Sequence, residues 1–158
     1  MRAVHIEARL EKLGIKLQPP TPPKGNYVRG VRSGNLFYMS GHIPQNQTDG
    51  TMITGKVGGD VTPEEARDAA RMIALSMVSS LKAELGDLDR VNQVVKLVGF
   101  VNCVHDFTEQ VFVLNGASDA MIEVFEEKGV HARSAVGTNT LPLGISVEIE
   151  AIIEINDG

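Results

Sequence analysis

Two charged residues near the C-terminus have the side chains and the setting for a binding site. Arg133 begins an extended segment of residues 133–138, and Glu148 lies among aliphatic residues of the segment 145–155. The functional interpretation is a site for a small carboxylate, because the planar guanidinium binds a carboxylate through two parallel hydrogen bonds. The alternative is an interstrand or solvated ion pair, which is the commoner situation of charged residues.

The usual catalytic templates do not occur in this chain. No Gly-rich phosphate loop or nucleophile elbow is present, and the four histidines lack the spacing of metal ligands. The single cysteine, Cys103, excludes an intramolecular disulfide and a cysteine-rich zinc site, and its place in an apolar segment is typical of an inert core thiol. We therefore expect neither a metal nor a cofactor.

The composition is typical of one globular domain. The 158 residues are 42% hydrophobic and 22% charged, with a formal net charge of -5. This charge does not favour a nucleic-acid partner, and no apolar run approaches the length of a membrane span. The single cysteine fits a reducing compartment, so the cytoplasm is the simplest expectation for the location. We place an N-terminal helix and Pro-rich connector at residues 1–24 and a single domain at residues 25–158.

Turn residues divide the N-terminal half into short elements. Apolar residues at helical spacing predict a leader helix within residues 3–14, followed by the stiff Pro-rich connector. Two strands, at residues 26–31 and 36–40, form a predicted hairpin. The segment 42–61 is rich in Gly, Asn, Asp and Thr and predicts a loop across the surface.

A well-marked helix follows this loop. Thr62 and Glu65 form a capping box around Pro63 at the first helical position, and Gly86 provides the stop. The next segment, residues 93–104, carries apolar residues at both the odd and the even positions. Because alternate residues of a strand face opposite sides of a sheet, this pattern predicts a strand that is buried on both faces.

The C-terminal part predicts a second helix and two strands. The helix spans about residues 106–128 and is expected to break near Asn115-Gly116. Strands follow at about residues 133–138 and 145–155. In the last strand the aliphatic residues alternate with Glu148 and other polar residues, so Glu148 faces away from the helices that cover the aliphatic face.

The order of these elements predicts an α+β sheet with two helices packed on one face. The strands at 36–40 and 93–104 also carry apolar residues on the opposite face, and no further large element of the chain can cover it. Association with further copies of the same chain is the economical way to bury that face.

The C-terminal segments and several earlier ones together resemble a known family. The matching residues are, in chain order, Tyr27-Val28, Gly30-Val31, Gly34-Asn35, Ser40-Gly41, Ile43-Pro44, Arg133-Ser134, Leu141-Pro142 and Val147-Glu148-Ile149-Glu150-Ala151. The Arg-Ser pair, the Leu-Pro turn and the Glu-containing strand together resemble the signature of the RidA/YjgF family of reactive intermediate deaminases. The similarity covers about residue 27 to the C-terminus.

The resemblance implies a fold and an assembly. The fold is chorismate-mutase-like, and the assembly is a homotrimer whose sheets form a central barrel with three clefts between neighbouring subunits. This assembly agrees with the apolar sheet face inferred above. The expected partners are further copies of the chain and a small carboxylate-bearing metabolite.

The resemblance also implies a reaction. Arg133 would hold the carboxylate of a 2-imino or 2-enamino acid, and Glu148 would position or activate the water that attacks the imine carbon, which yields a 2-keto acid and ammonia without a cofactor. The residues expected to line the same cleft are Tyr27, Ser40, Gly41, Asn115 and Ala135. Four of these five have a simpler alternative: Tyr27 as a packed strand residue, Ser40-Gly41 as a strand end, and Asn115 as a helix cap or break.

Departures from the family pattern leave the chemistry open, and they include the leader helix and the long loop at residues 42–61. Ala135 stands where many members have a cysteine, so no thiol is available there, and His42 stands where members often have glutamine. A non-catalytic binder or sensor that uses the same cleft is therefore the main alternative to a deaminase. A ribonuclease is less favoured, because the chain is acidic and has no basic, aromatic-rich stripe.

Overall fold

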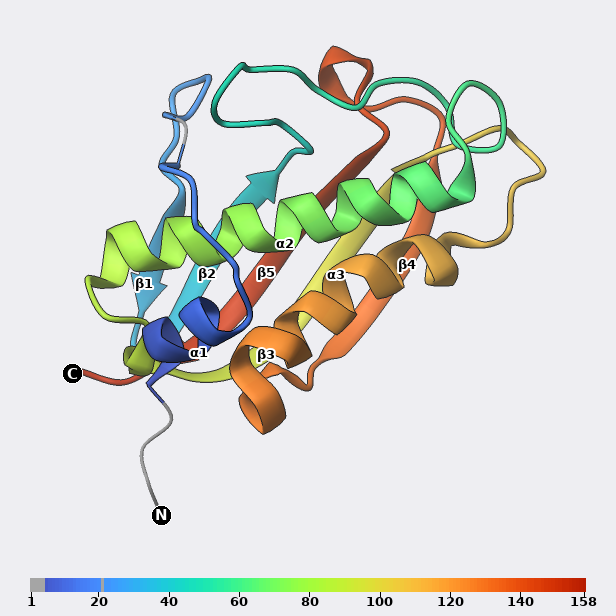
Figure 1. Cartoon of the computed structure of the whole chain (residues 1–158). Helices are drawn as coiled ribbons and strands as arrows, with labels where there is room; N and C mark the ends of the chain where they lie inside the picture. The colour runs from blue at the N-terminus through green and yellow to red at the C-terminus, as the bar shows by residue number, and fades with distance from the viewer. Residues whose placement is uncertain (1–4, 21) are drawn as a thin grey trace.

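The computed structural model describes residues 5–20 and 22–158, and its elements follow the predicted order (Figure 1). The helices are α1 (Ile6–Lys12), α2 (Pro63–Leu85) and α3 (Gln110–Phe125). The strands are β1 (Gly30–Ser33), β2 (Leu36–His42), β3 (Val91–Asn102), β4 (Ala132–Thr138) and β5 (Val147–Ile155). Single turns of 3-10 helix occupy Leu88–Arg90, Glu126–Gly129 and Pro142–Gly144.

The five strands form one sheet in the order β1-β2-β5-β3-β4. The β1–β2, β2–β5 and β5–β3 pairs are antiparallel, whereas β3 and β4 run parallel because α3 carries the chain back between them. The last strand of the chain is therefore central, and β4 forms an edge. One full strand, β3, separates β4 from β5.

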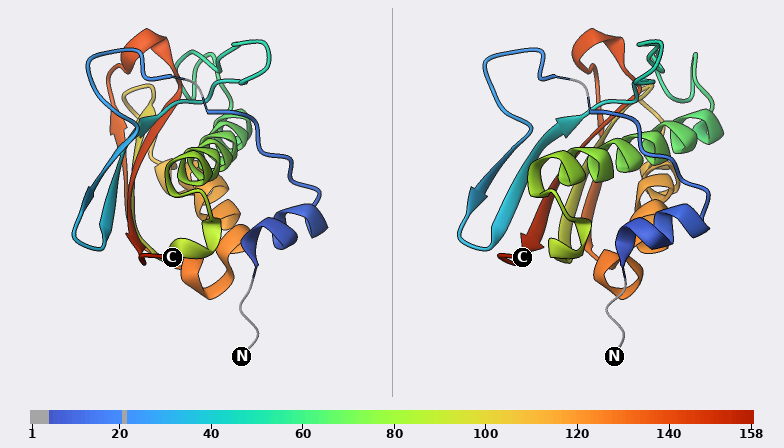
Figure 2. Two further views of the ribbon diagram at one scale, coloured as in Figure 1. Left: turned by 90° about the vertical axis from the view of Figure 1, so that its left-hand side faces the viewer. Right: turned by 60° about the vertical axis from the view of Figure 1, so that its left-hand side comes forward.

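Helices α2 and α3 lie side by side on one face of the sheet, and α1 lies outside them (Figures 1 and 2). The predicted capping box starts α2: the Thr62 hydroxyl accepts a hydrogen bond from the Glu65 amide, and the Glu65 carboxylate accepts one from the Thr62 amide. Ile73, Met77 and Leu81 on its inner side are fully buried in the core. Each such side chain contributes about 1.5–3 kcal/mol through removal of apolar surface from water.

The expected break of the second helix near Asn115-Gly116 is wrong. Helix α3 is continuous from Gln110 to Phe125, and Gly116 serves a packing contact instead. A Cβ atom at Gly116 would lie 2.1 Å from the Arg67 carbonyl oxygen, so the glycine lets α3 approach the backbone of α2. The predicted helix also began too early, since residues 106–109 are not helical and α3 starts at Gln110.

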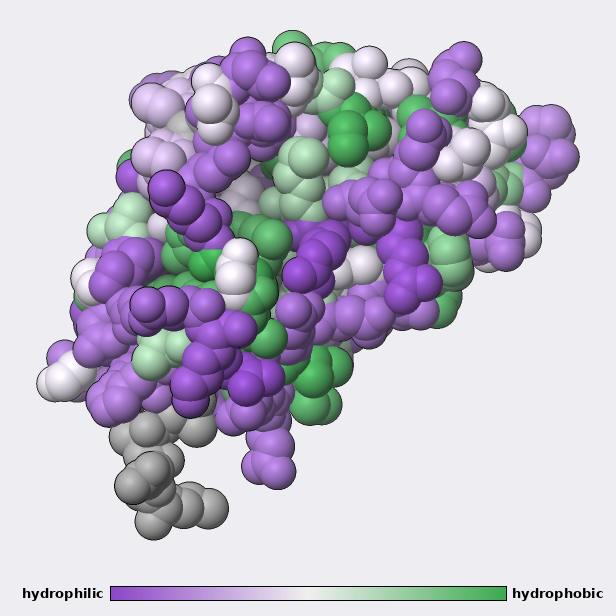
Figure 3. All heavy atoms as spheres, in the orientation of Figure 1, coloured by the Kyte–Doolittle hydropathy of each residue, from purple (hydrophilic) through white to green (hydrophobic). Residues whose placement is uncertain are grey.

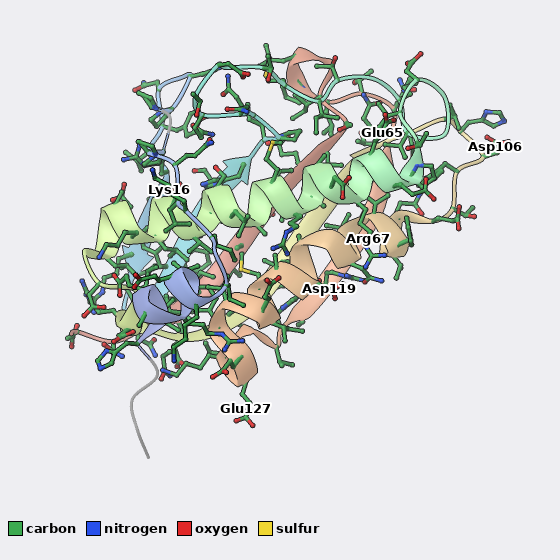
Figure 4. The ribbon with its side chains drawn as sticks, in the orientation of Figure 1. Lys16, Glu65, Arg67, Asp106, Asp119 and Glu127 are labelled. Atoms are coloured by element: carbon green, nitrogen blue, oxygen red, sulfur yellow. The ribbon has the colours of Figure 1, made fainter. Side chains whose placement is uncertain are left out.

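Ion pairs join the same two helices on their outer side. Arg67 of α2 and Asp119 of α3 point toward each other, 3.0 Å apart between nitrogen and oxygen, as Figure 4 shows. The surrounding surface is mostly hydrophilic, with small hydrophobic areas (Figure 3). This layer is therefore the solvent side of the chain.

Among residues 5–20 and 22–158, no helix lies over the opposite face of the sheet (Figure 2). Tyr38, Val98, Phe100, Val136 and Ile152 lie on this open face, where they are half-buried or exposed. The prediction that the strand at 93–104 is buried on both faces is wrong for a single chain, because only the face of β3 toward the helices is covered. The observed strand also begins and ends two residues earlier, at Val91 and Asn102.

The N-terminal helix joins the helical layer. Ile6 and Leu10 are buried, and the Arg9 Nε donates a hydrogen bond of 2.7 Å to the Glu123 carbonyl of α3. The helix lies within the predicted range, of which residues 3 and 4 are outside the described residues. No helix in the described ranges combines the length and the apolar character that a membrane crossing requires.

Candidate functional site

A cleft of about 600 Å³ opens beside the ends of β2 and β5. Four of the residues that the sequence singled out line it: Tyr27, Ser40, Gly41 and Glu148. They come from the segment before β1, from β2 and from β5, which are neighbours because β5 pairs with β2. The structure thus brings one half of the predicted site together within a single chain.

Glu148 projects onto the open face of the sheet, as the strand alternation predicts. Its neighbours Val147 and Ile149 point to the helices and are fully buried. Partial burial, and secondarily the charge of Glu150, raises the pKa of the Glu148 carboxyl above its ordinary value of 4.5. A carboxylate with a raised pKa is a stronger base, which suits it to accept a proton from water.

Gly41 leaves the space that the Glu148 carboxylate occupies. A Cβ atom at position 41 would lie 2.2 Å from the Glu148 Oε1 atom, well inside any allowed contact. Any larger residue at this position would therefore displace the carboxylate.

A β-bulge at the end of β2 produces this arrangement. Met39 pairs with Ala151 and His42 pairs with Ile149, so three steps along β2 match two steps along β5. The extra residue changes the parity of the strand and turns the His42 side chain toward α2 instead of the open face. Strict alternation through the strand would have placed the His42 side chain on the open face of the sheet.

His42 is buried between the cleft and α2. Its Nδ1 lies 2.7 Å from the Ser40 carbonyl oxygen and its Nε2 lies 2.8 Å from the Ser80 Oγ. A carbonyl can only accept, so Nδ1 carries the proton and Nε2 accepts from the Ser80 hydroxyl. Burial lowers the pKa of His42, and the nearby Arg29 charge adds to this, against the opposing effect of the Ser40 carbonyl.

Arg29 and His42 also line the cleft, although the sequence alone did not indicate either of them as a cleft residue. The Arg29 Nε donates to Glu84 of α2 at a distance of 3.2 Å. Arg29 lies two residues after Tyr27 and His42 directly follows Gly41, so proximity to the matched residues is the signal that could have indicated both.

Arg133 does not reach this cleft within one chain. It lies on the edge strand β4 opposite the buried Leu97, and its side chain points to the helical face. Glu148 lies on β5 and faces the other way, with β3 between the two strands. The two halves of the predicted site are therefore on opposite faces and toward opposite edges of the sheet.

Contacts from α3 hold the Arg133 guanidinium. One nitrogen, Nη1, donates to the Asn115 Oδ1 and to the Ser118 Oγ, each at a distance of 2.9 Å. Within the part of the chain that the structure describes, Nε and Nη2 have no hydrogen-bond partner. These two atoms form one complete edge of the guanidinium, the edge that binds a carboxylate side-on.

Asn115 is thus next to Arg133 rather than at a helix break. Ala135, two residues farther along β4, lies on the same side of the strand and packs against the core. Cys103 is also buried and lies near Gly137 of β4. Neither Ala135 nor Cys103 reaches the cleft beside Glu148 in one chain.

The described residues contain one group of carboxylates close enough to share an ion, namely Glu7, Asp87 and Asp89. Each of these three carboxylates already has an ion-pair or hydrogen-bond partner within the protein. Lys82 pairs with Glu7, His5 lies 2.8 Å from Asp89, and the Asp87 side chain accepts the Asp89 amide at a 3-10 turn. These contacts explain the cluster as surface ion pairing and capping.

Comparison with known proteins places the chain in a family. The family described as "YjgF/chorismate mutase-like, putative endoribonuclease" matches residues 7–153. Protein TCP17 of Trypanosoma cruzi is 50% identical over 96% of this chain and 95% of its own length. A 2-iminobutanoate/2-iminopropanoate deaminase of Dermatophagoides farinae is 32% identical over 84% of this chain and 88% of its own length.

A solved structure gives the same result for the fold. The crystal structure of a protein of unknown function from Agrobacterium tumefaciens has a TM-score of 0.88 and 44% sequence identity to this chain, and the match covers 98% of this chain and 94% of that one. The α+β, chorismate-mutase-like fold predicted from the sequence is confirmed. From its sequence match and from its fold, this chain belongs to the YjgF/RidA family.

Proposed function

We propose that the protein hydrolyses 2-imino and 2-enamino acids to 2-keto acids and ammonia at a cleft between two subunits of a homotrimer. The observation that carries this proposal is the Glu148 carboxylate in the 600 Å³ cleft, with its raised pKa and with the space that Gly41 leaves. The deaminase name of a relative at 32% identity supports the substrate class.

The positions of Arg133 and Glu148 favour a cleft between subunits. The two residues lie on opposite faces of the sheet, so one chain cannot direct both at a small molecule. A neighbouring copy that covers the open face would bury Tyr38, Phe100 and Val136 and could bring its own β4 edge to the cleft. Arg133 of one subunit would then complete the site of the next.

In this assembly each residue has one chemical task. The Nε–Nη2 edge of Arg133 binds the substrate carboxylate and places the imine carbon beside Glu148. Glu148 takes a proton from water as the oxygen attacks the imine carbon, and the C=N double bond becomes a C–N single bond. The proton then passes to the nitrogen, which gives a carbon that bears both a hydroxyl and an amino group. Glu148 next takes the hydroxyl proton and passes it to the nitrogen, and the C–N bond breaks as the C=O bond of the keto acid forms, so that ammonia leaves.

A direct assay tests the reaction. An amino-acid lyase generates 2-aminoacrylate in the cuvette, and the release of pyruvate is measured with and without the protein. We expect acceleration by the wild type, and a loss of about a hundredfold or more in Arg133→Ala and in Glu148→Gln. Arg67→Ala and Glu127→Gln, at surface positions outside the cleft, serve as matched controls and should retain the rate.

The proposal fails if the wild type does not exceed the uncatalysed rate. The second candidate function is then a non-catalytic binder. Ala135 favours this function, because its alkyl side chain supplies no reactive group. That candidate requires saturable binding of 2-oxobutanoate that Arg133→Ala abolishes, with no turnover of any imine.

A further inference from the structure

A chain of hydrogen bonds runs from Arg133 into the protein and ends at a histidine. Arg133 Nη1 donates to the Ser118 Oγ at 2.9 Å, and the Ser118 Oγ lies 2.8 Å from the Nε2 of His131. The other ring nitrogen of His131, Nδ1, lies 2.6 Å from the Gly129 carbonyl oxygen. Ser118 is buried on α3, while His131 precedes β4.

The donors and acceptors of this chain have only one consistent arrangement with a neutral imidazole. The Gly129 carbonyl can only accept, so His131 Nδ1 carries the proton and Nε2 is an acceptor. The Ser118 hydroxyl therefore donates its proton to Nε2. Its oxygen is then oriented to accept from Arg133, which has no acceptor of its own.

The same contacts determine which edge of the guanidinium remains available. Both protons of Nη1 are engaged, one by Ser118 and one by Asn115. An end-on contact through Nη1 and Nη2 would have to break one of these bonds. The side-on contact through Nε and Nη2 breaks none.

We propose that His131 is a positioning residue for Arg133, which acts through Ser118 and fixes the guanidinium for side-on binding of a carboxylate. The inference rests on the proposed function only in taking that carboxylate to be the substrate's. Without the fixed acceptors, the long arginine side chain at an exposed sheet edge has many rotamers, and a ligand must restrict them on binding. A merely structural role, in which His131 caps the turn at Gly129, would leave Arg133 unaffected.

The binding of 2-oxobutanoate, measured by isothermal titration calorimetry, separates the two roles. We expect Ser118→Ala and His131→Leu to raise the Kd by about threefold to tenfold, the effect of one lost hydrogen bond. Ser118→Thr keeps the hydroxyl and His131→Gln keeps an acceptor near the Nε2 position, so both should retain most of the affinity. His105→Leu, at an exposed histidine, is the matched control.

Nitrogen-15 NMR of the unliganded protein provides a second measurement that needs no ligand and no turnover. We expect His131 Nε2 to show the shift of an unprotonated acceptor, and the Arg133 Nη1 protons to exchange slowly in the wild type and in Ser118→Thr. In Ser118→Ala and His131→Leu the Nη1 proton that is bonded to Ser118 should lose this protection, while the melting temperature stays near that of the wild type.

The outcomes separate this inference from the proposed function. Unchanged affinity in Ser118→Ala and His131→Leu, with binding abolished by Arg133→Ala, overturns the positioning role and leaves the carboxylate site in place. If Arg133→Ala binds normally, the carboxylate site itself is wrong, and the NMR exchange rates alone then decide whether His131 restrains Arg133. If the Nη1 proton that is bonded to Ser118 in the wild type remains protected in both Ser118→Ala and His131→Leu, the proposal is also overturned.

Discussion

Gly41 and Glu148 are in contact across β2 and β5, and a Cβ atom on Gly41 would lie 2.2 Å from the Glu148 Oε1. The obstructed group is the end of a flexible side chain, so the fold can accommodate a methyl group by turning the carboxylate away. The glycine thus controls the place of the carboxylate more than the stability of the sheet.

We predict that Gly41→Ala lowers the rate of imine hydrolysis by about tenfold to a hundredfold, because misplacement of a catalytic group by about 1 Å has effects of this size. The melting temperature should change little. Steady-state rates and thermal unfolding check the two parts. The control is the Glu148→Ala background, in which Gly41→Ala should have no further effect; a further loss there would show that Gly41 acts by another route.

Mixed assemblies test whether two chains share one site. Arg133→Ala and Glu148→Gln should each be inactive alone. When the two variants are denatured, mixed in equal amounts and refolded together, random pairing gives an intact Arg133 and Glu148 at about a quarter of the interfaces of a cyclic oligomer. We therefore expect about a quarter of the wild-type rate.

The same mixing without denaturation is the control for this experiment, since intact homo-oligomers should exchange subunits slowly. A site contained within one chain would give no recovery in either case. A size-exclusion profile with the mass of a trimer would support the assembly independently of activity.

His42 should make the stability of the protein sensitive to acid. Its pKa in the folded chain lies below the ordinary value of 6.5, so the unfolded chain binds the proton more tightly. The resulting stability is present above the ordinary pKa and is lost as the pH falls below it. We predict that the free energy of unfolding decreases from about pH 7 to about pH 5, and that this decrease is smaller in His42→Gln.

Urea unfolding at several pH values measures this difference. His105→Gln, at an exposed position, should follow the wild type across the range. An equal pH dependence in wild type and His42→Gln would contradict the assignment of His42 as a buried neutral group.

Gly116 should matter for the stability of the helical layer. A Cβ atom there would lie 2.1 Å from the Arg67 carbonyl oxygen, and backbone cannot move aside as a side chain does. We predict that Gly116→Ala destabilises the protein by about 1–3 kcal/mol, the typical effect of overpacking, despite the better helix propensity of alanine. Val111→Ala, at an exposed position of the same helix, should have a small effect in the same urea titration. A stabilised Gly116→Ala variant would show that the two helices can separate freely.

Local signals in the sequence determined most of the elements. The capping box at Thr62 and the alternation around Glu148 act over a few residues, so they predicted the start of α2 and the open face of β5 correctly. The motif of Arg133 and Glu148 likewise indicated the family. The local pattern at Asn115-Gly116 gave a wrong prediction. Gly116 is needed for a close contact with the backbone of Arg67, which is distant in the sequence.

Only the tertiary structure decided how the site is divided. The sequence places β4 directly before β5, but pairing inserts β3 between them, and strand order depends on contacts between distant segments that no local pattern encodes. The bulge near Gly41 likewise depends on the register of β2 against β5, and it turns His42 to the inside. The sequence by itself determined which residues are chemically able to form a carboxylate site. The sheet decided that Arg133 and Glu148 point away from each other, because neighbouring side chains take their direction from strand order and register rather than from their order in the chain.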